Sequence, residues 1–274
     1  MRVLRWLVVV AVAGAALIAS GVALGVGPWP GLAGAVVSPS GDVRYTASRG
    51  NGSTTVRAVR PAKQGGVLAT AQFDGAWGIP AVTSTGVAGG VSPDGRMLVL
   101  SEPPSYKGLR SESKFLLVST ATLELEDTIV LNGEFGFDTL SSDGRTLYLI
   151  QHRSRADLVS YVVRGYDLRQ KGLLPGVIVA KGETGSMRGY PVARATSHGG
   201  TWVYTLYHRL NGNPFVHALN TGQRFAVCID LPTRIGSSNI WSARIVLSPD
   251  GRRLVVRSGG AAVATVDTMT FRVR

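Results

Sequence analysis

Cysteine, histidine and charged residues are all scarce in this chain of 274 residues. The single cysteine, Cys228, excludes any disulfide within the chain and any zinc cluster built on cysteines. Four histidines leave little for a site with several histidine ligands. Only 17% of the residues are charged and 45% are hydrophobic, whereas disordered chains are rich in charge and poor in apolar residues. We therefore expect a folded protein, and we predict neither a metal nor a cofactor.

The motifs of common hydrolases are also missing. The sequence contains no Gly-x-Ser-x-Gly nucleophile elbow and no His-Glu-x-x-His zinc helix. Cys228 lies between Val227 and Ile229, and this apolar setting is typical of a core strand rather than of a nucleophile. No catalytic residue is predicted on these grounds.

The charges that are present are mostly positive. Lysine and arginine number 29 against 17 acidic residues, which gives a net charge of +12. The excess consists mainly of arginine in a chain rich in Ala, Gly and Val, a composition that codon bias in a GC-rich genome also produces. No run of five basic residues marks a nucleic-acid-binding tail, so nucleic acid is not expected as a partner. A polyanion of another kind is favoured by long-range attraction.

The first thirty residues form a separate segment. Arg2 and Arg5 precede an uncharged stretch over residues 6–26, which is long enough to cross a bilayer as a helix. The charge distribution favours a cytoplasmic N-terminus and a body outside the cytoplasm. We predict a signal anchor within residues 1–30, with a cleaved signal peptide as the alternative, because Ala33-Gly34-Ala35 resembles a cleavage site.

One turn recurs along the rest of the chain. It reads Ser-Pro-Ser-Gly or Ser-Pro-Asp-Gly at residues 38–41, 92–95 and 248–251, with variant copies at 141–144 and 197–200. The copies are about fifty residues apart, which is the period of propeller blades. Gly95 and Gly251 should have positive φ, because glycine adopts that conformation without steric cost. The degenerate fourth copy should tolerate a side chain at Gly199 better than the last copy does at Gly251.

Short alternating strands surround each turn, as in residues 96–100 and 252–256. About four antiparallel strands fit in each repeat, and a sandwich would not repeat at this period. We predict an all-β fold over residues 36–274, a β-propeller of about five blades at 36–79, 80–132, 133–183, 184–232 and 233–274. The first and last repeats should meet to close the ring; a degenerate sixth blade or another chain are the alternatives. Extra structure is expected between Asp74 and Val91.

Residues 36–274 resemble known bacterial propellers. Ser-Pro-Asp-Gly-Arg followed by an alternating strand is similar to the repeats of TolB-like (WD-like) propellers, and Val266-Asp267-Thr268-Met269-Thr270 resembles the core of YVTN-type repeats. The resemblance implies the propeller fold. It implies little about activity, because these families include scaffolds, binding proteins and lactonases.

The candidate site is the face opposite the repeated turns, where loops join the second and third strands of each blade. These loops, at 49–52, 102–114, 152–158, 208–213 and 257–260, contain a cation in every blade, and nearby loops before the first strands add aromatic residues. Glu134 and Asp138 are expected to line the central channel, although nothing pairs them as acid and base. The predicted binding residues are Arg49, Lys107, Arg110, Lys114, His152, Arg153, Arg155, His208, Arg209, Arg257, Trp77, Tyr190 and Trp241.

Cations and aromatic rings on one face suit an anionic or sugar-containing ligand. We expect an extracytoplasmic propeller, tethered or secreted, that acts as a binding or scaffold module for an acidic protein or an anionic envelope polymer. A lactonase-like or other hydrolase of propeller fold is the main alternative, and a purely structural envelope protein is another. A further interpretation is that the rings pack between blades and the cations are simply solvated.

Overall fold

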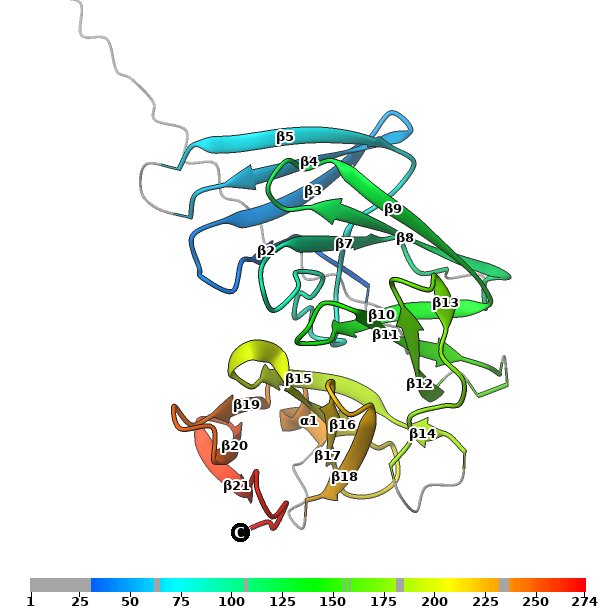
Figure 1. The fold of residues 1–274 in the computed structure, drawn as a ribbon. Helices are drawn as coiled ribbons and strands as arrows, with labels where there is room; N and C mark the ends of the chain where they lie inside the picture. Colours follow the sequence, from blue (N-terminus) through cyan, green and yellow to red (C-terminus); the bar gives the residue numbers. More distant parts are fainter. Residues whose placement is uncertain are drawn as a thin grey trace, which may run out of the picture.

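The computed structural model describes residues 31–61, 65–105, 108–154, 156–157, 159–180, 185–231 and 237–274 (Figure 1). The predicted membrane-spanning stretch lies outside these residues. Within them, no helix has both the length and the apolar character that a membrane crossing requires.

The described chain is almost entirely antiparallel β-structure. Sheet 1 contains β2 (Ala35–Val37), β3 (Arg44–Gly50), β4 (Ser53–Val59) and β5 (Val67–Asp74). Sheet 2 contains β7 (Met97–Ser101), β8 (Glu112–Ser119) and β9 (Leu125–Asn132). Sheet 3 contains β10 (Glu134–Leu140), β11 (Thr146–His152), β12 (Ser160–Asp167), β13 (Gly172–Leu173) and β14 (Met187–Arg188).

The C-terminal part continues the pattern. Sheet 4 contains β15 (Tyr190–Thr196), β16 (Trp202–His208), β17 (Phe215–Asn220) and β18 (Phe225–Asp230). Sheet 5 contains β19 (Arg244–Leu247), β20 (Arg253–Ser258) and β21 (Ala261–Asp267). Two short strands, β1 (Leu32–Ala33) and β6 (Ile79–Pro80), pair with each other. The helices are the 3-10 turn η1 (His198–Gly200) and α1 (Ser237–Ile240). The predicted all-β class is confirmed.

The repeated turns have one local structure. Gly95, Gly144 and Gly251 have φ of 74°, 67° and 70°, which confirms the positive φ predicted for the first and last of them. In the turn at 141–144 the Ser141 hydroxyl donates to Asp143 at 2.6 Å, and this hydrogen bond lowers the pKa of the carboxyl. The same serine–aspartate bond recurs in the turns at 92–95 and 248–251. These serine and aspartate side chains therefore stabilise the turns.

The fourth copy of the turn departs from the expectation for Gly199. Gly199 has φ of 74°, so a side chain there is strained just as it is at Gly251. The expected difference between the two positions is not supported. The constrained position is the neighbouring Gly200, where an added Cβ would lie 2.5 Å from Cγ of Pro93 in the turn before sheet 2.

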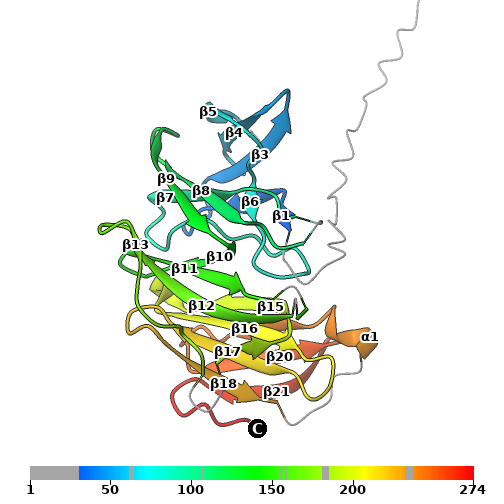
Figure 2. The same cartoon turned by 90° about the vertical axis from the view of Figure 1, so that its right-hand side faces the viewer.

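Buried side chains join each sheet to the next. One cluster lies between sheets 1 and 2, a second between sheets 2 and 3, a third between sheets 3 and 4, and a fourth between sheets 4 and 5. Figure 1 shows the resulting arc, and Figure 2 again places sheet 1 and sheet 5 toward opposite ends of the molecule. Among the described residues, no such cluster joins sheet 5 back to sheet 1. The direct closure expected from the sequence is not seen.

The expected extra structure between Asp74 and Val91 crosses the middle of the arc. The amide of Ser84 donates to the carbonyl of Pro191 at 2.7 Å, and the Thr85 hydroxyl donates to the carbonyl of Val192 at 2.6 Å. This central segment therefore ties the N-terminal half of the chain to β15 in sheet 4.

Candidate functional site

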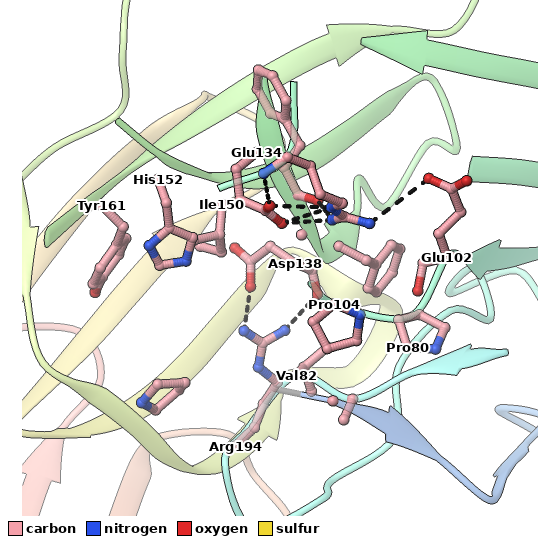
Figure 3. A pocket seen from close by; sticks show the side chains of 18 of the residues that line it. Pro80, Val82, Glu102, Pro104, Glu134, Asp138, Ile150, His152, Tyr161 and Arg194 are labelled. Atoms are coloured by element: carbon pink, nitrogen blue, oxygen red, sulfur yellow. Dashed lines mark hydrogen bonds and ion pairs between the residues drawn. The ribbon is translucent and has the colours of Figure 1, made fainter. Parts of the chain in front are cut away.

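A pocket of about 50 Å³ lies at the inner ends of sheets 2, 3 and 4 (Figure 3). Its walls come from the central segment, the β7–β8 loop, the inner strands β10 and β15, and the ends of β11, β12 and β16. We call it the axial pocket. Its principal side chains are Pro80, Val82, Glu102, Pro104, Arg110, Glu134, Phe135, Phe137, Asp138, Ile150, His152, Tyr161, Pro191, Arg194 and Tyr207.

A buried ion pair joins sheet 2 to sheet 3 at this pocket. Arg110 Nη2 lies 2.6 Å from Glu134 Oε1, and Arg110 Nε lies 3.0 Å from the same oxygen. The backbone amide of Arg110 also donates to Glu134 Oε2 at 2.7 Å. The Glu134 side chain is only 2% exposed. Several charge-assisted hydrogen bonds to one carboxylate hold the β7–β8 loop in place.

A second buried pair joins sheet 3 to sheet 4. Arg194 Nη2 donates to Asp138 Oδ1, and Nη1 donates to the Asp138 carbonyl at 2.6 Å. Arg194 Nε donates to the hydroxyl of Thr205 at 3.1 Å. The two charged side chains are 9% and 4% exposed. Removing one member of such a pair leaves an uncompensated buried charge, so the pair acts as a clamp between the two inner strands.

Aromatic and imidazole rings form the deep wall of the axial pocket. Tyr161 stacks on Tyr207 with 5.3 Å between ring centroids, and His152 lies tilted at 6.4 Å from Tyr161. Burial raises the pKa of both phenols, which keeps them neutral at physiological pH. Behind them, burial lowers the pKa of His217 to about 4. The two phenols and the His217 imidazole are therefore uncharged around neutral pH.

The ionisable side chains of this site are engaged within the fold. Glu134 and Asp138 line the pocket as expected, but each is held by an arginine from the neighbouring sheet. Within the described parts of the chain, no group of three or more His, Cys, Asp or Glu side chains is placed to hold a metal ion. Cys228 lies half-buried in β18 and packs against the cluster between sheets 3 and 4.

Two of the predicted site residues, Arg110 and His152, come together in the axial pocket. Three others form an aromatic group between sheets 4 and 5. Trp241 lies edge-on to Tyr190 at 5.9 Å and to His208 at 5.7 Å. Burial lowers the pKa of His208. Trp241 remains 43% exposed, so this group offers one ring to solvent.

Three other predicted residues are engaged within the fold. Trp77 is buried between sheets 1 and 2 and donates from Nε1 to the Asp74 carbonyl at 2.6 Å. Arg209 pairs with Asp230 at 2.6 Å and lies over the Phe215 ring at 4.1 Å. Lys114 pairs with Glu112 at 2.9 Å. Part of the positive charge counted in the loops is therefore balanced locally.

The remaining cations differ in exposure and partners. Arg49 and Arg153 are exposed and make no ion pair with the described residues, while the exposed Arg257 donates to the Gly260 carbonyl at 2.6 Å. Lys107 and Arg155 lie outside the described residues. Arg194 is not among the predicted residues, because its only sequence signal is a charge in the otherwise apolar start of an inner strand.

Comparison with known proteins gives similarity in structure only. No family model matches the chain, and no curated protein matches it in sequence. Hydrazine synthase of Kuenenia stuttgartiensis superposes with a TM-score of 0.53 at 15% identity, over 90% of this chain and 70% of that chain. The Cps50 (Swd1) β-propeller domain of Myceliophteria thermophila superposes with a TM-score of 0.50 at 13% identity, over 88% of this chain and 69% of that chain.

TolB of Acinetobacter baumannii is also similar, with a TM-score of 0.47 at 13% identity, over 87% of this chain and 52% of TolB. The fold resembles that of the Cps50 (Swd1) β-propeller domain, as the repeated turns predicted, and TolB structures are among the similar proteins. At identities of 13–15% the likeness concerns the fold alone.

Proposed function

We propose that the protein is a binding module in which sheets 1 to 5 serve as five propeller blades. Residues 6–26 hold it outside the cytoplasm as a signal anchor, or release it when the segment is cleaved. The face formed by the β3–β4, β7–β8 and β11–β12 loops, around the mouth of the axial pocket, binds an anionic envelope polymer or an acidic protein.

One observation carries this proposal: positive charge is balanced inside the site and unbalanced around it. In the axial pocket, Arg110 and Arg194 are matched by Glu134 and Asp138. On the surrounding loops, Arg49 and Arg153 are exposed and unmatched by the described residues. Arg153 directly follows His152, which lines the pocket. Exposed like charges favour an anion that approaches the same face.

The hydrolase alternative is less well supported by the same residues. A hydrolase of this fold would need Glu134, Asp138 or His152 to reach a substrate in the axial pocket. The two carboxylates instead accept hydrogen bonds from arginines that join neighbouring sheets. Their geometry is explained by holding the sheets together, which a binding module also requires.

The test compares two charge reversals of equal size on opposite faces. The loop-face variant is Arg49→Glu with Arg153→Glu. The control is Arg60→Glu with Arg224→Glu, two exposed arginines on loops that join the third and fourth strands of their sheets. Binding of the full-length chain in mild detergent to an isolated envelope polymer fraction and to an acidic polypeptide, poly-L-glutamate, is measured at low salt. The loop-face variant should bind at least tenfold more weakly than the control variant. If the two variants bind each of the two ligands with equal affinity, the proposal is refuted.

A further inference from the structure

The two ends of the arc each leave one face of a sheet uncovered. In sheet 5, Leu254, Val256 and Val266 are buried against sheet 4. Side chains alternate along a strand, so their neighbours Val246, Arg253 and Val255 project from the opposite face. Val246 is 50% exposed, although it lies on the inner strand β19. We call this the open face of sheet 5.

The open face of sheet 5 is strongly basic. Arg244 lies directly opposite Arg257 in the β19–β20 ladder, and like charges in that position are destabilising. The last residues of the chain add to this face, because Arg274 exchanges two backbone hydrogen bonds with Thr265 of β21. The charged side chains on this face are Arg244, Arg253, Arg257, Asp267, Arg272 and Arg274.

The open face of sheet 1 is similar at the other end of the arc. Tyr45 and Val56 are buried against sheet 2, so Arg44 and Arg57 project from the opposite face, which also carries the exposed Asp74 of β5. Val37 lies directly opposite Arg44 and is 48% exposed on the inner strand β2. Here too an exposed valine at the inner edge is accompanied by exposed arginines farther out.

The two open faces do not complement each other. Both are basic, and direct contact between them would bring arginine against arginine at a distance where salt screens poorly. Inner-strand valines of a closed propeller are covered by the next blade, whereas Val37 and Val246 are exposed. Each side of the gap therefore presents an exposed inner-strand valine with arginines farther out, which is the character of a binding surface.

We propose that an acidic partner protein docks in the gap between sheets 1 and 5, placing apolar side chains on Val37 and Val246 and carboxylates on the surrounding arginines. This goes beyond the loop-face binding proposed above, because it uses a different surface. The positive charge of both open faces favours an acidic occupant. Residues 1–30 contain two arginines and no acidic residue, and a second copy of the chain would bring the same basic faces. A polyanionic polymer would pair with the arginines but leave the valines exposed.

The experiment uses two synthetic peptides of equal length and charge, one alternating Glu with Val and the other alternating Glu with Ser. Each is titrated against the full-length chain in mild detergent at low salt, by fluorescence anisotropy. The gap variant is Arg244→Glu with Arg253→Glu. The controls are Arg60→Glu with Arg224→Glu, which lies elsewhere, and the loop-face variant Arg49→Glu with Arg153→Glu.

The Glu–Val peptide should bind at least tenfold more tightly than the Glu–Ser peptide, and only the gap variant should lose that difference. Loss in the loop-face variant alone would assign the peptide to the proposed loop-face function and overturn the gap proposal. Equal affinity for both peptides would show a polyanion site, and no binding would also overturn the proposal. Sedimentation velocity on the same samples tests whether a second copy of the chain occupies the gap. A dimer of the wild-type chain that dissociates in the gap variant would contradict the proposal of an acidic partner protein.

A photo-crosslinking residue tests where the Glu–Val peptide contacts the protein. p-Benzoylphenylalanine in place of Val246 should capture the Glu–Val peptide. The same residue in place of Leu210, which is 64% exposed on the β16–β17 loop, should not. Equal capture at both positions would contradict the assignment to the gap.

Discussion

Gly200 is the position where the repeated turn and the packing between sheets meet, and Gly200→Ala should be more destabilising than the same change in another turn. Gly200 has φ of 78°, a conformation that costs an alanine about 1 kcal/mol. The new Cβ would also lie 2.5 Å from Cγ and 2.8 Å from Cβ of Pro93. The proline ring is stiff, so relief requires the turn before sheet 2 to move, and overpacking of this kind costs about 1–3 kcal/mol more.

Gly251→Ala and Gly199→Ala are the matched controls. Both glycines have positive φ, and an added Cβ at either meets nothing within 4 Å. Alanine at either position therefore has the free-energy cost of a positive φ but makes no close contact like the one with Pro93. The free energy of unfolding of the full-length chain is measured by urea denaturation, followed by tryptophan fluorescence. Gly200→Ala should lose about 2–4 kcal/mol and each control about 1 kcal/mol. Equal losses at Gly200 and Gly251 would refute the inferred packing between the turns.

Three further outcomes are expected. His217 is neutral when folded because burial lowers its pKa from 6.5 to about 4, while the unfolded chain is protonated below 6.5. The free energy of unfolding should therefore fall as pH drops from 6.5 toward 4, by up to about 3 kcal/mol, and His217→Asn should flatten this slope in urea titrations; an unchanged slope would contradict the assignment. Arg194→Met should cost about 3–5 kcal/mol because Asp138 stays buried. Lys171→Met, at the exposed pair with Asp127, should cost much less than Arg194→Met in the same assay, and similar losses for the two variants would count against the buried clamp. A C-terminal alkaline phosphatase fusion should be active in cells; an inactive fusion would place the body in the cytoplasm.

The turns and strands were predictable because their determinants are local. Ser141, Asp143 and Gly144 stabilise one turn through bonds among neighbours in the sequence, so the pattern is visible in every copy. The alternation of β20 follows from a sheet with one covered face, where Leu254 and Val256 are buried.

The site was only partly predictable because its charges are balanced over long distances along the chain. Arg110 pairs with Glu134, and Arg194 pairs with Asp138 across two sheets, although nothing near either arginine in the sequence identifies its partner. Trp77 was predicted on the loop face because it lies in a loop before the first strand of a blade, but it packs between sheets 1 and 2. Closure of the arc depends on how each pair of sheets packs, and no local pattern reports that geometry.

The most direct test of the central claim, that surface arginines bind an anionic partner, is the salt dependence of binding. Affinity of the full-length chain for the isolated envelope polymer fraction is measured over a series of salt concentrations, beside the loop-face variant Arg49→Glu with Arg153→Glu. Exposed charges are screened over about 8–10 Å at physiological ionic strength, so the wild-type affinity should fall steeply with salt and the variant should show a shallower fall from a weaker start. An affinity that does not change with salt, or identical salt series for the two proteins, would contradict the account.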